Sequence, residues 1–169
     1  EPERQLLEAK AQIMVADYRA DLAELARVRD AMVPLAHDPQ WGYLAHYWAG
    51  FASWRLAING VNRGISPTDV KAHLEKASVD LDAAVRLRDD FADGYAAAAS
   101  VNGWLGTMQG SDVAKFRELV THARQQLARA KELAPVNPRG VWVEAMTLSG
   151  TPVAYGGNPE RALQILRAS

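Results

Sequence analysis

Successive segments of the chain carry apolar residues three, four or seven positions apart, a spacing that is typical of amphipathic helices. Between residues 67 and 88, for example, Val70, Leu74, Ala77, Leu81 and Ala84 form one such stripe. No stretch alternates apolar and polar residues convincingly over the length of a strand. The sequence therefore predicts an all-α fold of about seven helices, over residues 3–33, 39–60, 67–88, 92–109, 112–134, 138–149 and 159–168.

Capping residues, prolines and glycines mark the ends of these segments. A side chain that can cap a helix precedes a proline suited to the first helical turn in Asp38-Pro39, Ser66-Pro67, Asn137-Pro138 and Asn158-Pro159. Ser111-Asp112 predicts a fifth start, whereas Gly64, Gly110 and Gly150 predict helix ends. Because the loops between the segments are short, consecutive helices are expected to pack antiparallel.

An internal repeat appears when residues 81–95 are laid over residues 127–141, an offset of 46 that takes Leu81 to Leu127. The same offset takes Ala77 to Ala123 and Ala84 to Ala130. Alanines seven apart on one helix face allow a partner helix to approach closely. We therefore expect helix pairs that bury one face internally and the other against the next pair, with the terminal helices as caps.

The run from Ala123 through Ala130 to Pro135 resembles the second helix of a tetratricopeptide repeat (TPR) and the turn that follows it. That family carries small residues seven apart and then a proline at the turn. Residues 157–163, which include Ala162, resemble the family's turn and its next small position, and Ala99 and Ala145 match its small position on the first helix. The resemblance covers roughly residues 67–168.

The sequence also departs from the TPR pattern. The offset of 46 exceeds the family's repeat of about 34 residues. Asp89 stands where the turn proline is expected, and residues 1–60 lack the alanine pair. The fold is therefore described as TPR-like, and an irregular helical bundle remains the alternative.

The resemblance implies antiparallel helix hairpins stacked as a short TPR-like solenoid in a single domain. Its parts are an N-terminal capping helix over 1–36, a first pair over 39–89, a second over 92–134 and a third over 138–169. The family presents a concave surface, lined by the first helix of each pair, to a protein or peptide. By position, that lining comprises Trp41, Leu44, Trp48, Asp93, Ala96, Ser100, Gly103, Trp104, Arg139, Trp142 and Met146. The residues predicted to bind the partner are Trp41, Trp48, Asp93, Ser100, Trp104, Arg139, Trp142 and Met146.

Aromatic residues gather in the segment 39–60, which is apolar nearly all round and is expected to be buried between neighbours. Its core stripe is predicted to hold Tyr43, Tyr47, Phe51 and Trp54. Trp41 and Trp48, seven residues apart, share a second face that could meet a partner. The sequence leaves open whether this helix forms only core or also lines a pocket.

The sequence lacks the motifs of common catalytic and metal sites. The histidines at positions 37, 46, 73 and 122 are scattered, although His46 is expected to be partly buried in the aromatic helix. Three acidic residues cluster at a helix end, Asp89, Asp90 and Asp93. Capping of the next helix explains this cluster more simply than an acid–base pair does. The Gly-rich residues 155–159 lack the lysine of a phosphate-binding loop. No enzyme activity, cofactor or metal is therefore predicted.

Charge and composition limit the kinds of partner and the location that the sequence predicts. The 19 basic and 20 acidic residues nearly cancel, whereas a nucleic-acid-binding protein is expected to carry a basic excess. No uncharged apolar run approaches the roughly 20 residues that cross a bilayer. The first residue is Glu1 rather than Met, and cysteine is absent, which leans towards a periplasmic or exported location.

Two other functions compete with protein or peptide binding. A small-ligand receptor would need an apolar cavity on which polar groups converge, for which His46, Asn102 and Glu144 are candidates. A self-assembly unit would use the apolar stripe of residues 3–33, whose period is close to that of a coiled coil, so a homo-oligomer is also considered.

Overall fold

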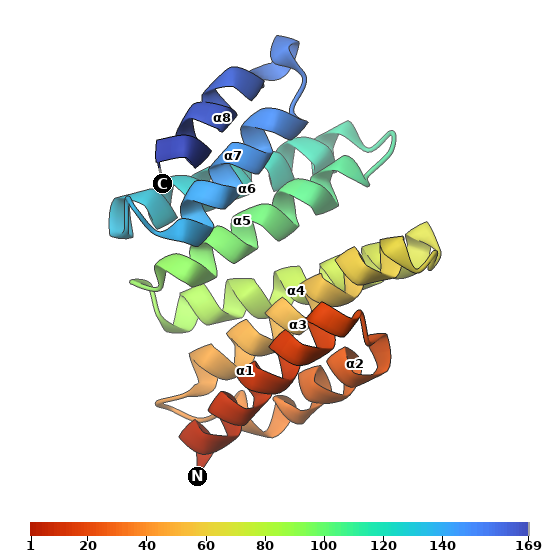
Figure 1. Ribbon diagram of the computed structural model, residues 1–169, viewed down its shortest axis with the longest axis vertical. Coiled ribbons are helices and arrows are strands. Elements are labelled where there is room, and N and C mark those ends of the chain that lie inside the picture. The colour runs from red at the N-terminus through yellow and green to blue at the C-terminus, as the bar shows by residue number, and fades with distance from the viewer. Residues whose placement is uncertain (169) are drawn as a thin grey trace. The chain divides into compact units, whose positions relative to one another are not determined.

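The computed structural model describes residues 1–168, apart from the side chain of Tyr155, and contains helices but no strand over that range (Figure 1). The predicted all-α class is confirmed. The α-helices are α1 (Pro2–Arg19), α2 (Leu22–Ala31), α3 (Gly42–Asn62), α4 (Pro67–Leu87), α5 (Ala92–Thr107), α6 (Val113–Leu133), α7 (Pro138–Gly150) and α8 (Pro159–Ala168). Two short 3₁₀ turns span Val33–Leu35 and Val153–Tyr155.

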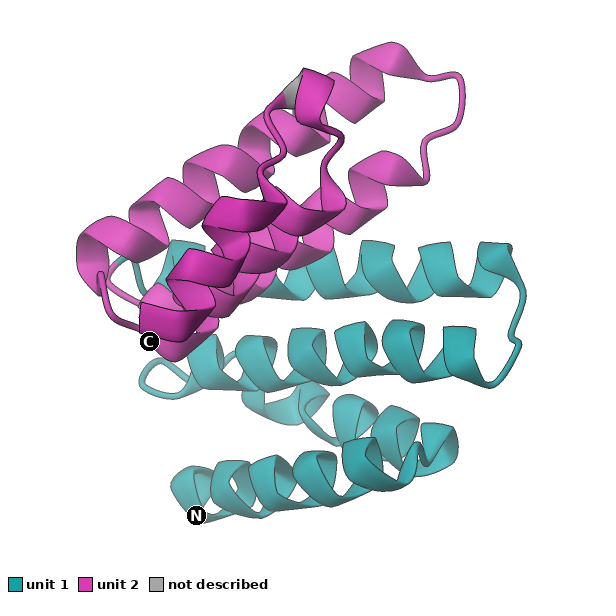
Figure 2. Cartoon of the chain, turned by 45° about the horizontal axis from the view of Figure 1, so that its top comes forward, with its two compact units in different colours: residues 1–89 teal, residues 90–169 magenta. Residues whose placement is uncertain are grey.

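The chain divides into two compact units, drawn in different colours in Figure 2. Unit 1 is Glu1–Asp89 and holds α1 to α4, whereas unit 2 is Asp90–Ser169 and holds α5 to α8. The division falls between the first and second predicted helix pairs. The single domain remains a prediction.

The single helix predicted over 3–33 is wrong, because the chain forms α1 and α2 there. Ala20 adopts a left-handed conformation, with φ at 50°, and ends α1. The Asp21 side chain then accepts a hydrogen bond of 3.0 Å from the backbone N–H of Glu24 and caps α2. Asp21 and Glu24 have the spacing of a capping box. A new helix therefore starts at this point, although the apolar stripe continues across it.

Four of the predicted helix caps are confirmed. The side chains of Ser66, Asp112, Asn137 and Asn158 accept backbone N–H groups at the starts of α4, α6, α7 and α8. The segment predicted to begin at Pro39 becomes helical only at Gly42. Asp38 instead accepts from the backbone N–H groups of Gln40 and Trp41, at 2.9 and 2.8 Å, which stabilises a turn before α3.

The centre of unit 1 is α3, which packs against α1, α2 and α4. Polar contacts connect it to two of these neighbours. Arg55 and Asn59 both donate to Asp17 of α1, at 2.6 and 2.7 Å, and His46 lies 3.0 Å from Asp80 of α4. Tyr47, Phe51 and Trp54 are buried as predicted, and successive rings from Tyr47 to Trp54 contact one another.

In unit 2, α5 packs against α6 and α7, and α7 packs against α6 and α8. Alanines occupy the interfaces, as the repeat predicts. The small positions at 99, 123, 130, 145 and 162 are all buried. Asn102 lies in the same core and donates a hydrogen bond of 2.9 Å to Gln126 of α6.

Helix bounds follow the offset seen in the sequence. α4 and α6 each have 21 residues, and both their first and last residues lie 46 positions apart. α5 and α7 also begin 46 positions apart, at Ala92 and Pro138. In unit 1, Ala77 and Ala84 are buried like their counterparts in α6.

Candidate partner-binding surface

The eight predicted partner-binding residues fall in both units. Trp41 and Trp48 belong to unit 1, next to and within α3. The other six belong to unit 2 and are carried by α5 and α7, which pack against each other. The α5–α7 face is defined by these six residues, Asp93, Ser100, Trp104, Arg139, Trp142 and Met146.

α7 contributes the most accessible apolar side chains of this face. Arg139, Trp142 and Met146 are spaced three and four residues apart and therefore lie on one side of the helix. Trp142 is 41% exposed and Met146 is 50% exposed, whereas Val143 and Ala145 are buried on other sides. α7 thus buries Gly140, Val143 and Ala145 and leaves the larger Trp142 and Met146 in contact with solvent.

α5 contributes a half-buried stripe. Its members are Asp93, Ser100 and Trp104, each of which is partly accessible. Ser100 and Trp104 follow Asp93 by seven and eleven positions, so the three residues lie on one side of the helix. Ala96 was expected to line the same surface, but it is fully buried. Its assignment to the lining is wrong, because a side chain with no exposed surface cannot contact a partner.

A hydrogen bond and an ion pair connect the first residues of α5 and α7. Asn137 donates a hydrogen bond of 3.1 Å to Asp93, and the Arg139 side chain approaches the same carboxylate at 3.5 Å. Asn137 also caps α7 through its side-chain oxygen, so one residue fixes both the helix start and its contact with α5. The α5–α7 face therefore has a charged end, and Trp104 and Met146 lie further along the same two helices.

The two tryptophans of unit 1 have different environments. Trp48 is only 9% exposed, and its ring meets those of Tyr47 and Phe51 edge-on at 4.8 and 5.6 Å. The Lys10 ammonium lies 5.9 Å from the same ring. Most of Trp48 therefore belongs to the core, whereas Trp41 is half-buried at the start of α3.

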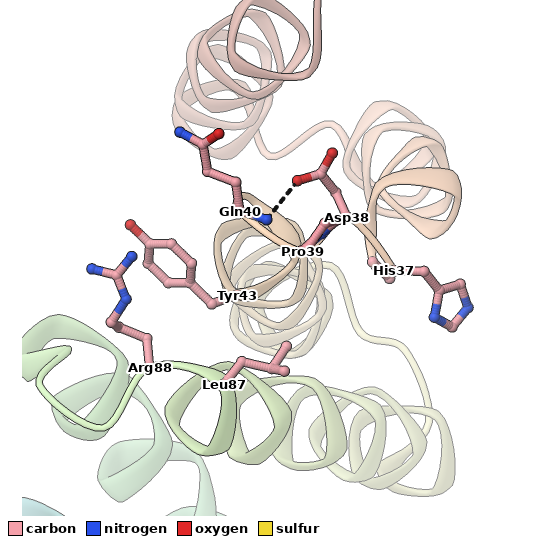
Figure 3. A pocket seen from close by; sticks show the side chains of 8 residues that line it. His37, Asp38, Pro39, Gln40, Tyr43, Leu87 and Arg88 are labelled. Atoms are coloured by element: carbon pink, nitrogen blue, oxygen red, sulfur yellow. Dashed lines mark hydrogen bonds between the residues drawn. The ribbon is translucent and has the colours of Figure 1, made fainter.

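A pocket lies beside the start of α3 in unit 1, and Figure 3 shows its lining. It has a volume of about 300 Å³ and is open to solvent. The Arg88 guanidinium lies over the Tyr43 ring, 4.4 Å from its centroid. Tyr43 was predicted to be core but is half-buried here. The lining residues are Ala36, His37, Asp38, Pro39, Gln40, Tyr43, Leu87 and Arg88.

The titratable groups engage in separate local contacts. His46, partly buried as predicted, contacts Asp80, and Glu144 accepts from Lys131 at 2.7 Å. Burial, followed by the charge of Arg29, lowers the pKa of His73 below its usual value. Over residues 1–168, no cluster of acidic and histidine side chains has the arrangement of a metal site.

No known protein family matches the chain, and no match was found among curated proteins or solved structures. Within residues 1–168, no helix combines the length and apolar character that crossing a bilayer requires. The geometry of the α5–α7 face is therefore the main basis for a functional proposal.

Proposed function

We propose that the protein is a scaffold or adaptor module that binds a protein or peptide through the α5–α7 face. The observation that carries this proposal is the exposure of Trp142 and Met146 on one side of α7, between the buried residues Val143 and Ala145. Large aromatic and apolar side chains that stay accessible beside a rigid helix packing are the usual anchors of protein interfaces. The proposal involves no catalytic step and no cofactor.

In this proposal the helix pairs form antiparallel hairpins stacked as a short TPR-like solenoid. The matching bounds of α4 and α6, and of the starts of α5 and α7, support a repeated unit of 46 residues. Buried alanines at equivalent positions support close contacts between helices, as such a stack needs. The first helices of the second and third pairs would then supply the lining, which makes α5 and α7 the surface to test.

The charged end of the face gives a bound peptide a direction. Asp93 and Arg139 lie 3.5 Å apart there, so a polar part of a peptide would align with this end and an apolar part with the rest of the face. Trp104, Trp142 and Met146 offer apolar contact area along the helices. A peptide with apolar or aromatic anchors and a polar end is the ligand that this arrangement favours.

The proposal is tested by selecting peptides from a display library against the whole chain and measuring their affinity for variants. Trp142→Ala should weaken binding by at least tenfold, which is typical of an interface anchor. Phe116→Ala is a matched control, because Phe116 is also 41% exposed but lies on α6. Equal losses in both variants, or no loss in Trp142→Ala, would overturn the proposal.

Self-assembly is a second candidate, favoured by α1. Leu7, Met14 and Tyr18 are exposed and lie on one side of this helix, opposite its buried residues. If α1 packs against α1 of a second copy, sedimentation should show a dimer. Tyr18→Ser should then weaken dimer formation. A monomer at high concentration would remove this candidate.

A further inference from the structure

The pocket beside α3 combines an apolar floor with a positioned cation, and we propose that it binds a carboxylate attached to a small apolar group. The carboxylate could come from a small organic acid or from the last residue of a peptide chain. The pocket lies wholly in unit 1, so this inference does not depend on the α5–α7 face.

The apolar part of the lining comes from two segments that packing brings together. Pro39 belongs to the turn before α3, and Leu87 is the last residue of α4. Leu87 is 59% exposed although it is large and apolar. In Figure 3 the Tyr43 ring lies beside the Arg88 guanidinium and points away from this leucine. An apolar group resting on Leu87 and Pro39 would remove apolar surface from water, which favours binding.

In this proposal the Arg88 guanidinium is the group that binds the carboxylate. Its guanidinium stacks over the Tyr43 ring, and this contact restricts the long side chain before any ligand arrives. The N–H groups of a guanidinium point outwards in its plane, and five donors leave capacity for a ligand even when some are engaged. A carboxylate at the edge of the guanidinium would accept one or two of these hydrogen bonds.

The other polar groups favour an anion over a cation. Arg88 carries the one permanent positive charge among the eight lining residues. Asp38 is the one acidic residue in the lining, and its carboxylate accepts two backbone N–H groups in the turn. In Figure 3 this carboxylate points towards Gln40, away from Leu87. A volume of about 300 Å³ lies at the lower end for small-molecule sites, which fits a short acid.

The test is an NMR titration of the whole chain with N-acetyl-leucine and, as a matched ligand, N-acetyl-leucinamide, which lacks the negative charge. We expect the acid to bind with a dissociation constant on the order of 1 mM and to shift the backbone signals of residues 36–43, 87 and 88. The amide should bind roughly fivefold more weakly, the upper range for one exposed ion pair.

Two variants assign the effect to the pocket. Arg88→Gln should weaken binding of the acid by about the same fivefold factor and leave binding of the amide unchanged. Arg86→Gln is the control, since Arg86 is exposed on the same helix end but does not line the pocket. Dispersed spectra of both variants would verify that they fold.

A short peptide ending in leucine separates the two sources of the carboxylate. Tighter binding of this peptide than of N-acetyl-leucine, lost on C-terminal amidation, would assign the site to a chain terminus. Binding of the small acid alone would assign it to organic acids. The proposal is overturned if acid and amide bind equally, if Arg88→Gln binds the acid as wild type does, or if no signals of the pocket shift.

Discussion

The close contact between α3 and α4 can be tested by adding a single methyl group at Gly50. A Cβ at this position would lie 2.7 Å from Cγ of Leu81 and 3.1 Å from its backbone nitrogen. Neither atom can swing aside, because one is the branch point of a fully buried side chain and the other belongs to the α4 backbone. Gly50→Ala therefore forces the two helices apart or deforms one of them.

The expected magnitude follows from two opposing effects. Replacing a helical glycine by alanine stabilises a helix by about 1 kcal/mol. Overpacking a tight interface costs about 1–3 kcal/mol. Because the contact at Gly50 involves backbone, we take the upper part of that range and expect Gly50→Ala to lose about 1–2 kcal/mol.

Gly103 provides the matched control, since it lies within α5 and is also helical. A Cβ there would meet only the Cβ of Ala123, at 3.9 Å, which is an ordinary contact. Gly103→Ala should therefore gain about 0.5–1 kcal/mol from helix propensity alone. Urea unfolding followed by far-UV circular dichroism measures both free energies, and if the two units unfold separately each variant should shift its own transition. A stabilising effect of Gly50→Ala would refute the close contact between α3 and α4.

Three further perturbations have defined outcomes. Asp21→Ala removes the cap of α2 and should cost about 1 kcal/mol in urea unfolding, whereas an unchanged midpoint would mean that the cap contributes nothing. Burial and the charge of Arg29 lower the pKa of His73 below 6.5. The neutral His73 side chain therefore contributes fully to the free energy of unfolding above pH 6.5, and this contribution is lost as the pH falls through the lowered pKa. His73→Gln should flatten that loss in a series of unfolding curves, and an equally steep loss in the variant would contradict the assignment. Ala130→Leu overfills a buried helix contact and should cost about 1–3 kcal/mol by the same measurement, with a neutral result arguing against close packing there.

The sequence predicts the helices because their signals are local. Asn137 caps α7 through atoms two and three residues away, and the stripe of α6 is set by its own period. The buried alanines were also predictable, since a small residue repeated every seven positions has few other uses in a helix. The break at Ala20 was missed because the apolar stripe continues across it, although Asp21 and Glu24 carry the capping signal.

The proposed binding surfaces depend on contacts between distant residues and were predicted less completely. Position on a helix indicated that Trp142 would be accessible, but it also placed Ala96 on the lining, although Ala96 is fully buried. The stacking of Arg88 on Tyr43 joins the end of α4 to the start of α3, and no local pattern indicates it. Interhelical geometry, rather than periodicity, decides these positions.

Methyl NMR of the methionines tests the proposed binding surface most directly. The chain has four methionines, of which Met146 lies on the α5–α7 face and Met32 is buried in unit 1. When a peptide selected on the whole chain is added, the methyl signal of Met146 should shift and that of Met32 should stay in place. A bound peptide that leaves Met146 unchanged while it shifts Met14 on α1 would contradict the account.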